Sequence, residues 1–415
     1  MCVLSIYNLY LIADFFVTLR SIWKYGVRSR DIWNLNKKRY MKKVVIAVDS
    51  FKGSLSATEV AEAVTKAFND VVPECEVVSL PLSDGGEGLT EVLVNHLGGR
   101  YHTIDAFDPL MRPIKVQFGA VGRCAIIEMA TAAGLTLLSE EERNPMNTTT
   151  YGVGVMMQAA LDLGYRKMLI GIGGSATNDA GLGAMQALGL RCYNSQGRVI
   201  KAPITGAMLQ DVTHLDLTSL KRKMADIELI VACDVQNPLF GPHGAACVYA
   251  PQKGANDDEV KVLDAGLRHI SHVWRRCCGI TIENQPCMGA AGGFGGAFAT
   301  LLNAQLRSGI DCILDILNFD NILDDADLVV TGEGTIDAQS LMGKALTGLL
   351  RRSNQAGVPV LAIAGHIDDR EAVIRAGVSE CLEVSSRSIS IEEAMQPDIA
   401  RQNIITVISN WIKVD

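Results

Sequence analysis

Six glycines in one short segment surround a run of small polar side chains. The segment, GIGGSATNDAGLGAMQALG at 171–189, follows the apolar run 168–170, which is typical of a buried strand. Glycine weakens regular structure, so this many glycines favour a loop that lets a ligand approach the backbone closely. The backbone N–H groups at 173–175, ahead of a helix expected to begin at Asn178, are suited to hold the phosphate oxygens of a nucleotide.

Five further glycine-containing segments, most of them with acidic residues, fall at the expected ends of strands. They are DSFKGS (49–54), LSDGGEG (82–88), ACDVQNPLFGPHGA (232–245), GAAGGFGG (289–296) and TGEGTIDAQSLMGK (331–344). Ligands of open α/β sheets bind where the carboxyl ends of strands meet the starts of helices, so this recurrence predicts a ligand site there. The chain has no G-x-x-x-x-G-K-[ST] P-loop, and GIGGSA lacks the full dinucleotide fingerprint. The candidate nucleotide-binding residues are Gly173, Gly174, Ser175, Gly292, Gly293 and Lys344.

Carboxylates gather at the same strand ends. They are Asp49, Asp84, Glu87, Asp179, Asp234, Glu333 and Asp337. Like charges at apolar strand ends indicate Mg²⁺ binding or proton abstraction, and phosphoryl transfer uses both. Asp179 is the first candidate for the general base and Asp84 the second, while the metal candidates are Asp234, Glu333 and Asp337. For each acid alone a helix cap or a turn is an equal alternative, for Asp179 in particular.

Two lysines lie beside glycines in these segments, Lys52 and Lys344. A cation at such a place is apt to neutralise a phosphate or the carboxylate of a substrate, although a solvated surface lysine is equally compatible with the spacing. We expect Lys52 to act at the catalytic centre as well as on the substrate. The candidate substrate-binding residues are Ser50, Lys52, Gly85, Gly86 and Asn178.

The elements that must position these residues alternate between strand and helix. VVIAVDSF at 44–51 has the pattern of a buried parallel strand, and a helix follows whose capping box is formed by Ser56 and Glu59. From 100 to 130 the pattern changes to an antiparallel meander, and a long helix is expected at 257–278. After 310 the alternation of strand and helix returns.

The predicted fold class is α/β: a discontinuous, doubly wound parallel-sheet domain of the Rossmann or flavodoxin-like kind, with a second, mixed α+β domain inserted. The first domain comprises 41–99 and 306–415, and the inserted domain, 100–305, carries the Gly-rich phosphate loop. Two crossings between domains suit hinge closure over a substrate.

The chain of 415 residues has a net charge of -8 and only 6% aromatic residues, which argues against nucleic acid as a partner. Its 11 cysteines contain no C-x-x-C pair, which favours a reducing cytoplasm over a disulfide or zinc framework. Residues 1–40 differ in composition, and Asn8 and Asp14 interrupt their apolar stretch, so we expect no membrane span. We expect this segment to be an N-terminal extension that is not native, with Met41 as the start; an amphipathic surface helix is the alternative.

Six motifs in order from Met41 onward resemble the type 1 glycerate kinase family. They are DSFKGSLSA, PLSDGGEG, GIGGSATNDAGLGAMQALG, CDVQNPLFGPHGAACVYAPQKGA, GAAGGFGGA and DLVVTGEGTIDAQSLMGK. The resemblance implies a two-domain α/β enzyme, with its active site in the cleft between the domains, that uses ATP to phosphorylate D-glycerate, most often at the 2-hydroxyl. One departure from the family pattern is Ala180, where a glycine is common.

Several alternatives stay open at this point. The substrate could be another small hydroxy acid, the product could carry its phosphate at the 3-position, and a non-catalytic nucleotide-binding regulator is a third hypothesis. The density of acids argues against the regulator, because a sensor has little use for several carboxylates near phosphate. The sequence leaves open the oligomeric state, a homo-oligomer included, and which acid is the base.

Overall fold

The computed structural model describes residues 41–80, 82, 88–282, 285–337, 340, 345–385 and 390–413, so the expectation for residues 1–40 lies outside the described part. Two compact units emerge from the contacts between residues. The first unit is drawn from 1–80, 322–341 and 350–415, and the second from 81–321 and 342–349. Each unit has its own sheet and its own core.

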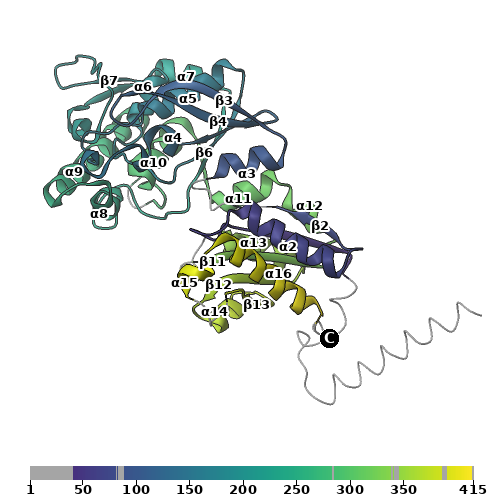
Figure 1. Ribbon diagram of the computed structural model, residues 1–415. Helices are drawn as coiled ribbons and strands as arrows, with labels where there is room; N and C mark the ends of the chain where they lie inside the picture. The colour runs from purple at the N-terminus through teal and green to yellow at the C-terminus, as the bar shows by residue number, and fades with distance from the viewer. Residues whose placement is uncertain are drawn as a thin grey trace, which may run out of the picture. The chain divides into compact units, whose positions relative to one another are not determined.

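The first unit contains a five-stranded, fully parallel sheet. Its strand order is β13 (Glu380–Glu383), β12 (Val360–Ile367), β11 (Leu328–Ile336), β1 (Lys43–Val48) and β2 (Glu76–Ser79). The connecting and covering helices are α2 (Ala57–Val71), α13 (Ala345–Ala356), α14 (Arg370–Arg375), α15 (Ile391–Ala394) and α16 (Pro397–Lys413), although α13 up to residue 349 is grouped with the second unit. Helices α2 and α16 pack side by side (Figure 1). The expected capping box at the start of α2 is confirmed, with Ser56 and Glu59 each bonding the other's backbone N–H.

The order of the strands reverses between β1 and β11. From β1 the chain passes through α2 to β2 on one side, whereas β11 leads through α13 and α14 to β12 and β13 on the other. This is the switch point of a doubly wound sheet, at whose carboxyl edge such folds bind ligands. The two strand ends are tied together there, because Asp49 N donates to Gly332 O at 2.8 Å. The predicted fold class is confirmed.

The second unit contains a mixed six-stranded sheet. Its order is β10 (Gln305–Arg307), β9 (Glu228–Ala232), β6 (Lys167–Gly171), β5 (Cys124–Glu128), β4 (Pro113–Val121) and β3 (Arg100–Phe107). The antiparallel meander β3–β4–β5 is present as expected, and β5, β6, β9 and β10 run parallel. The strands β7 (Arg191–Tyr193) and β8 (His214–Asp216) form a separate two-stranded antiparallel sheet.

Helices of the second unit differ widely in length. The long helix α9 has the expected bounds, Asp257–Cys278. The others are α3 (Leu89–His96), α4 (Ala130–Ala133), α5 (Tyr151–Asp162), α6 (Leu182–Ala187), α7 (Thr218–Met224), α8 (Ala245–Tyr249), α10 (Ala290–Leu302), α11 (Gly309–Ile316) and α12 (Phe319–Leu323) at its boundary with the first unit. None of the helices in the described part of the chain combines the length and the apolar character that crossing a bilayer requires.

Helix α3 belongs with the second sheet because of its packing on β4. A Cβ added to Gly119 would lie 2.5 Å from Val94 Cγ2 and 2.6 Å from Thr90 Cγ2, so α3 packs tightly on this face. Phe118, adjacent in the strand, points the opposite way into the core. The first unit therefore has its early boundary at 80 and its later one at 322, against 99 and 306 in the predicted domain division, which stays a prediction.

Candidate functional site

The Gly-rich loop, defined here as residues 173–181, connects β6 to α6 at the carboxyl edge of the second sheet. The helix begins at Leu182, so the expected start at Asn178 is wrong. Ala180 and Gly181 have left-handed backbones, with φ of 54° and 67°, which an α-helix cannot contain. This conformation explains why glycine suits position 180 and why the helix starts later than its sequence suggests.

Asp179 lies inside this loop with its side chain completely buried. Its Oδ2 accepts hydrogen bonds from Thr150 N at 2.8 Å, Thr150 Oγ1 at 2.7 Å and Gly183 N at 3.2 Å. Its Oδ1 accepts one from Gly181 N at 3.0 Å. Burial raises the pKa of Asp179, and the bonds from Thr150, Gly181 and Gly183 oppose that rise. The carboxylate therefore caps α6 and joins the loop to the start of α5, and it bonds N–H groups at the start of both helices.

Lys253 is a second buried ionisable residue at this loop. It ends a short 3₁₀ turn, Pro251–Lys253, and its side chain is 3% exposed. Its Nζ donates to Ser175 Oγ at 2.9 Å and to Thr177 O at 2.8 Å. Burial lowers its pKa to about 7, and the nearby charge of Asp179 opposes the decrease. Lys253 was missed from the sequence, where the only signal was a lysine before glycine in the motif APQKGA.

The turn at the start of α10 packs directly on the Gly-rich loop. Ala291, Gly292 and Gly293 have φ values of 50°, 65° and 91°. Gly292 O accepts a hydrogen bond from Ala180 N at 3.0 Å, and a Cβ at Gly292 would lie 2.2 Å from Thr177 O. The structure thus brings two of the candidate nucleotide-binding glycines, Gly292 and Gly293, against the buried half of this loop.

The exposed half of the loop consists of Gly173 and Gly174. Among the described residues, neither glycine donates its backbone N–H to another group. Two buried side-chain atoms farther along, Thr177 Oγ1 and Asn178 Nδ2, also have no hydrogen-bond partner in the described part of the chain. The loop thus combines backbone held by Asp179, Lys253 and Gly292 with N–H donors at Gly173 and Gly174, an arrangement suited to anion binding.

Two acids at the carboxyl ends of β9 and β5, the strands on either side of β6, hold helix starts. Asp234 follows β9, and its Oδ1 accepts a hydrogen bond from Gly309 N at 3.0 Å, at the first residue of α11. Glu128 ends β5 and accepts from Thr90 N at 2.6 Å and Gly88 N at 3.3 Å, at the start of α3. Glu128 was not singled out from the sequence, and its position directly after an apolar strand was the signal available.

The first unit places four other candidates at its switch point. Ser50 and Lys52 follow β1, while Glu333 lies in β11 and Asp337 directly after it. A Cβ on Gly334 would lie 3.4 Å from Lys52 N, so the two segments run side by side. Asp337 Oδ1 accepts hydrogen bonds from the backbone N and the Oγ of Ser340, at 2.9 Å and 3.2 Å.

Some predicted residues lie outside the described part of the chain, namely Asp84, Gly85, Gly86 and Lys344. Of the metal candidates, Asp234 belongs to the second unit and Glu333 and Asp337 to the first. No cluster of three or more His, Cys, Asp or Glu side chains suited to a metal occurs among the residues that are described. The chemistry of Glu333 and Asp337 still fits Mg²⁺, which takes one or two carboxylates and completes its shell with water and phosphate oxygens.

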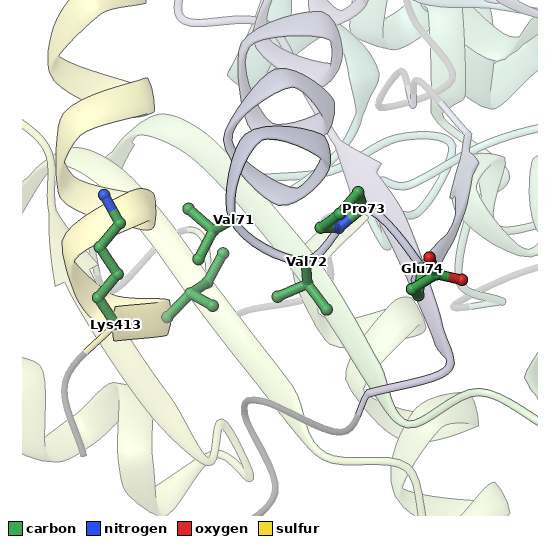
Figure 2. Close-up of a pocket in the computed structure, with 6 residues that line it drawn as sticks. Val71, Val72, Pro73, Glu74 and Lys413 are labelled. Atoms are coloured by element: carbon green, nitrogen blue, oxygen red, sulfur yellow. The ribbon is translucent and has the colours of Figure 1, made fainter.

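A surface hollow of about 440 Å³ lies elsewhere in the first unit. Figure 2 shows its lining, which comes from the end of α2 and the end of α16: Val71, Val72, Pro73, Glu74, Ile412 and Lys413. These residues include the segment just before β2, so the hollow lies toward the amino-terminal edge of the sheet. It is therefore not at the edge where the candidate residues lie.

Comparisons with known proteins agree with the motifs and the fold. Residues 44–414 match the model of the glycerate kinase family. A glycerate kinase of Haemophilus influenzae is 42% identical, with 90% of this chain and 98% of that protein aligned. A glycerate 2-kinase of Escherichia coli is 38% identical, with 85% and 93% aligned. A crystal structure from Salmonella typhimurium LT2, assigned as a glycerate kinase 2, superimposes with a TM-score of 0.80 at 38% identity, over 90% of this chain and 97% of that one. The chain belongs to the glycerate kinase family.

Proposed function

We propose that this protein transfers the γ-phosphate of ATP to D-glycerate and forms 2-phospho-D-glycerate and ADP. The observation that carries the proposal is the family match over residues 44–414, which includes both units. The named relatives support the substrate, since each aligns over at least 93% of its own length. The choice of the 2-hydroxyl rests on the glycerate 2-kinase among them.

The Gly-rich loop is the proposed site for the nucleotide phosphates. Gly173 and Gly174 offer backbone N–H donors at the surface, and Ser175 continues the loop inward toward Lys253. Gly292 and Gly293 contribute indirectly, because they pack against the buried part of the loop. Lys344 stays a candidate for the same phosphates.

The glycerate is assigned to the switch point of the first unit. Ser50 N donates to its neighbour Asp49 Oδ1 at 2.6 Å, which fixes the turn after β1. The exposed Lys52 side chain supplies a cation for the substrate carboxylate or the transferring phosphate. Gly85, Gly86 and Asn178 stay substrate-binding candidates, although the buried position of Asn178 makes indirect support through the loop the simpler role.

Mg²⁺ is the proposed cofactor, held through nucleotide phosphates with Glu333, Asp337 and Asp234 as candidate protein ligands. When bound, the ion neutralises charge on the phosphate that is transferred. A general base must also reach the substrate hydroxyl. Asp179 is buried with both oxygens bonded, which favours a role in fixing the loop and leaves Asp84 as the preferred base.

Phosphorus NMR of a reaction containing D-glycerate, ATP and Mg²⁺ tests the activity and the position of the phosphate together. We expect a single phosphomonoester at the 2-position and an equal amount of ADP. A 3-phosphate would correct the position only. If D-glycerate gives no product while another hydroxy acid in a parallel panel consumes ATP, the substrate assignment is wrong.

A lysine variant tests the substrate site. Lys52→Met should raise the KM for D-glycerate or lower kcat by about tenfold or more, because a charge-assisted contact is lost. Lys66→Met is the matched control, since Lys66 is an exposed lysine on α2 whose partner is Asp70. Equal kinetics in the two variants would remove Lys52 from the site.

A cytoplasmic location is proposed on the cysteine pattern and the metabolic substrates. The proposed partners are the two small molecules, D-glycerate and ATP. The oligomeric state stays open.

A further inference from the structure

Residue 176 of the Gly-rich loop is held by hydrogen bonds at both its N–H and its carbonyl group. Ala176 N donates to Ala133 O at 2.8 Å, and Ala176 O accepts from Thr148 Oγ1 at 2.8 Å. Lys253 Nζ bonds Ser175 and Thr177, the residues on either side. Segments distant in the sequence thus hold the three successive residues 175–177. Lys253 is the charged residue among their hydrogen-bond partners.

The turn that carries Lys253 is itself held in place. Gly254 has a φ of 97°, and a Cβ there would lie 1.9 Å from Arg143 O. The lysine therefore projects from backbone that has little freedom to shift. Both hydrogen bonds of its ammonium group go to the loop. The position of Lys253 therefore affects the position of Ser175 and, through the backbone, that of Gly173 and Gly174 at the surface.

A buried lysine is an expensive way to hold a loop. Taking an ammonium group out of water costs several kcal/mol even when it is partly compensated, and neutral donors could bond a hydroxyl and a carbonyl. The depressed pKa of Lys253, about 7, reflects that cost. A buried ammonium group is therefore better explained where its hydrogen bonds support a binding site as well as the fold.

We propose that Lys253 is a positioning residue, which holds the Gly-rich loop in the shape that binds the nucleotide phosphates. The inference rests on the proposed function. Lys253 reaches this role through Ser175 Oγ and Thr177 O and takes no part in the chemical step. Its loss should therefore disturb the nucleotide more than the glycerate.

The test compares Lys253→Met with the surface variant Lys261→Met, whose side chain on α9 is 75% exposed. We expect Lys253→Met to lower kcat/KM for ATP by about 10- to 100-fold, as small misplacements of binding groups do. The KM for D-glycerate should change by less than about twofold, and urea unfolding should show a cooperatively folded protein. Lys261→Met should behave as the wild type. The proposal is overturned if Lys253→Met keeps the wild-type kcat and KM for ATP, or if both substrates are affected equally.

Ser175→Ala provides a second route to the same contact. It removes one acceptor of the ammonium and should shift ATP kinetics in the same direction by a smaller factor. The double variant should be no worse than Lys253→Met alone, because Lys253→Met already removes the hydrogen bond that Ser175→Ala removes. Fully multiplicative losses would contradict the proposal, and if Lys253→Met does not fold, unchanged ATP kinetics in Ser175→Ala would overturn it.

Calorimetric binding of ATP with Mg²⁺ separates the two hypotheses. If the wild type does not phosphorylate D-glycerate, the proposed function fails. Weaker nucleotide binding by Lys253→Met than by Lys261→Met would then still support the role of Lys253. Equal binding by both variants would overturn it whatever the substrate.

Discussion

Asp179 and Lys253 show how burial changes the meaning of a charged residue in a glycine-rich loop. Asp179 has the residue type of a general base, yet both of its oxygens accept hydrogen bonds from the protein and water does not reach it. Lys253 lies more than 70 residues away in the sequence from the loop that it bonds, at separations of 76 and 78. Their contacts make both residues part of the support of the loop.

Asp179→Asn distinguishes a base from a structural acceptor. An asparagine replaces one acceptor oxygen with an N–H₂ group, which then faces backbone donors of Thr150, Gly181 or Gly183. We expect the free energy of unfolding to fall by about 1–3 kcal/mol in urea titrations, because buried donors are left unpaired. Asp105→Asn, at a carboxylate that is 85% exposed, is the control. A loss of turnover of at least about 100-fold without any loss of stability would instead support Asp179 as the base.

The lowered pKa of Lys253 predicts that the free energy of unfolding depends on pH. Its pKa is about 7 in the folded protein and about 10.4 in an unfolded chain, so between these values the unfolded state binds more protons. From pH 7 toward pH 10 the wild type should therefore gain stability relative to Lys253→Met, by up to about 1.4 kcal/mol per pH unit. Below pH 7 both states hold the proton and the gain should vanish. Urea unfolding of the two proteins from pH 6 to 9 measures the difference, and parallel curves would show that the nearby charge of Asp179 keeps Lys253 protonated.

At the scale of elements, the start of α10 acts as a support for the loop after β6. Three successive left-handed residues let the backbone of Gly292 contact Thr177 and accept the hydrogen bond from Ala180. The glycines at 292 and 293 are thus explained, because the backbone of Gly292 lies against the backbone of Thr177. The start of α3 is held differently, because the side-chain carboxylate of Glu128 at the end of β5 accepts the backbone N–H groups of Gly88 and Thr90.

Gly292→Ala should be strongly destabilising, and Gly279→Ala is its matched control. Both glycines have left-handed backbones, with φ of 65° and 70°, but a Cβ at Gly292 would lie 2.2 Å from Thr177 O, whereas Gly279 has open space. We expect a loss of about 1 kcal/mol at Gly279 from the backbone conformation alone. At Gly292 steric overlap should add about 1–3 kcal/mol more, and the KM for ATP should rise. Similar losses in thermal unfolding of the two variants would contradict the proposed contact.

At the scale of the whole molecule, one parallel and one mixed sheet each carry candidate residues at the carboxyl ends of parallel strands. The switch point of the first unit has Ser50, Lys52 and Glu333, and the second unit has the Gly-rich loop. In our proposal the substrate therefore binds at the sheet of the first unit, and the nucleotide binds at the sheet of the second unit. A divalent ion held mainly by nucleotide phosphates requires few protein ligands.

Removal of divalent ions should abolish the activity reversibly. We expect EDTA to reduce ATP consumption to background and Mg²⁺ to restore it. Glu333→Gln should raise the Mg²⁺ concentration for half-maximal rate by at least about tenfold, since metal sites lose that much when a supporting carboxylate is removed. Asp70→Asn, an exposed carboxylate on α2, should leave the metal dependence unchanged. Full activity in EDTA would exclude Mg²⁺ from the mechanism.

Local patterns in the sequence determined much of this protein. The capping box of Ser56 and Glu59, the bounds of α9, the meander and the alternating parallel strands depend on nearby residues, whose periodicity and polarity are visible in the chain itself. The motifs also predicted the family, because their order and spacing along the chain resemble the family pattern.

Only the tertiary structure decided how the candidate residues are used. Asn178 did not start a helix, because hydrogen bonds from Gly181 and Gly183 to Asp179 favour a left-handed turn first. Lys253 and Glu128 gained their roles from contacts between segments far apart in the chain. Burial and long-range hydrogen bonding are properties of the packed molecule, so residue type and spacing could identify the charged side chains but not which of them support the loop and which face a ligand.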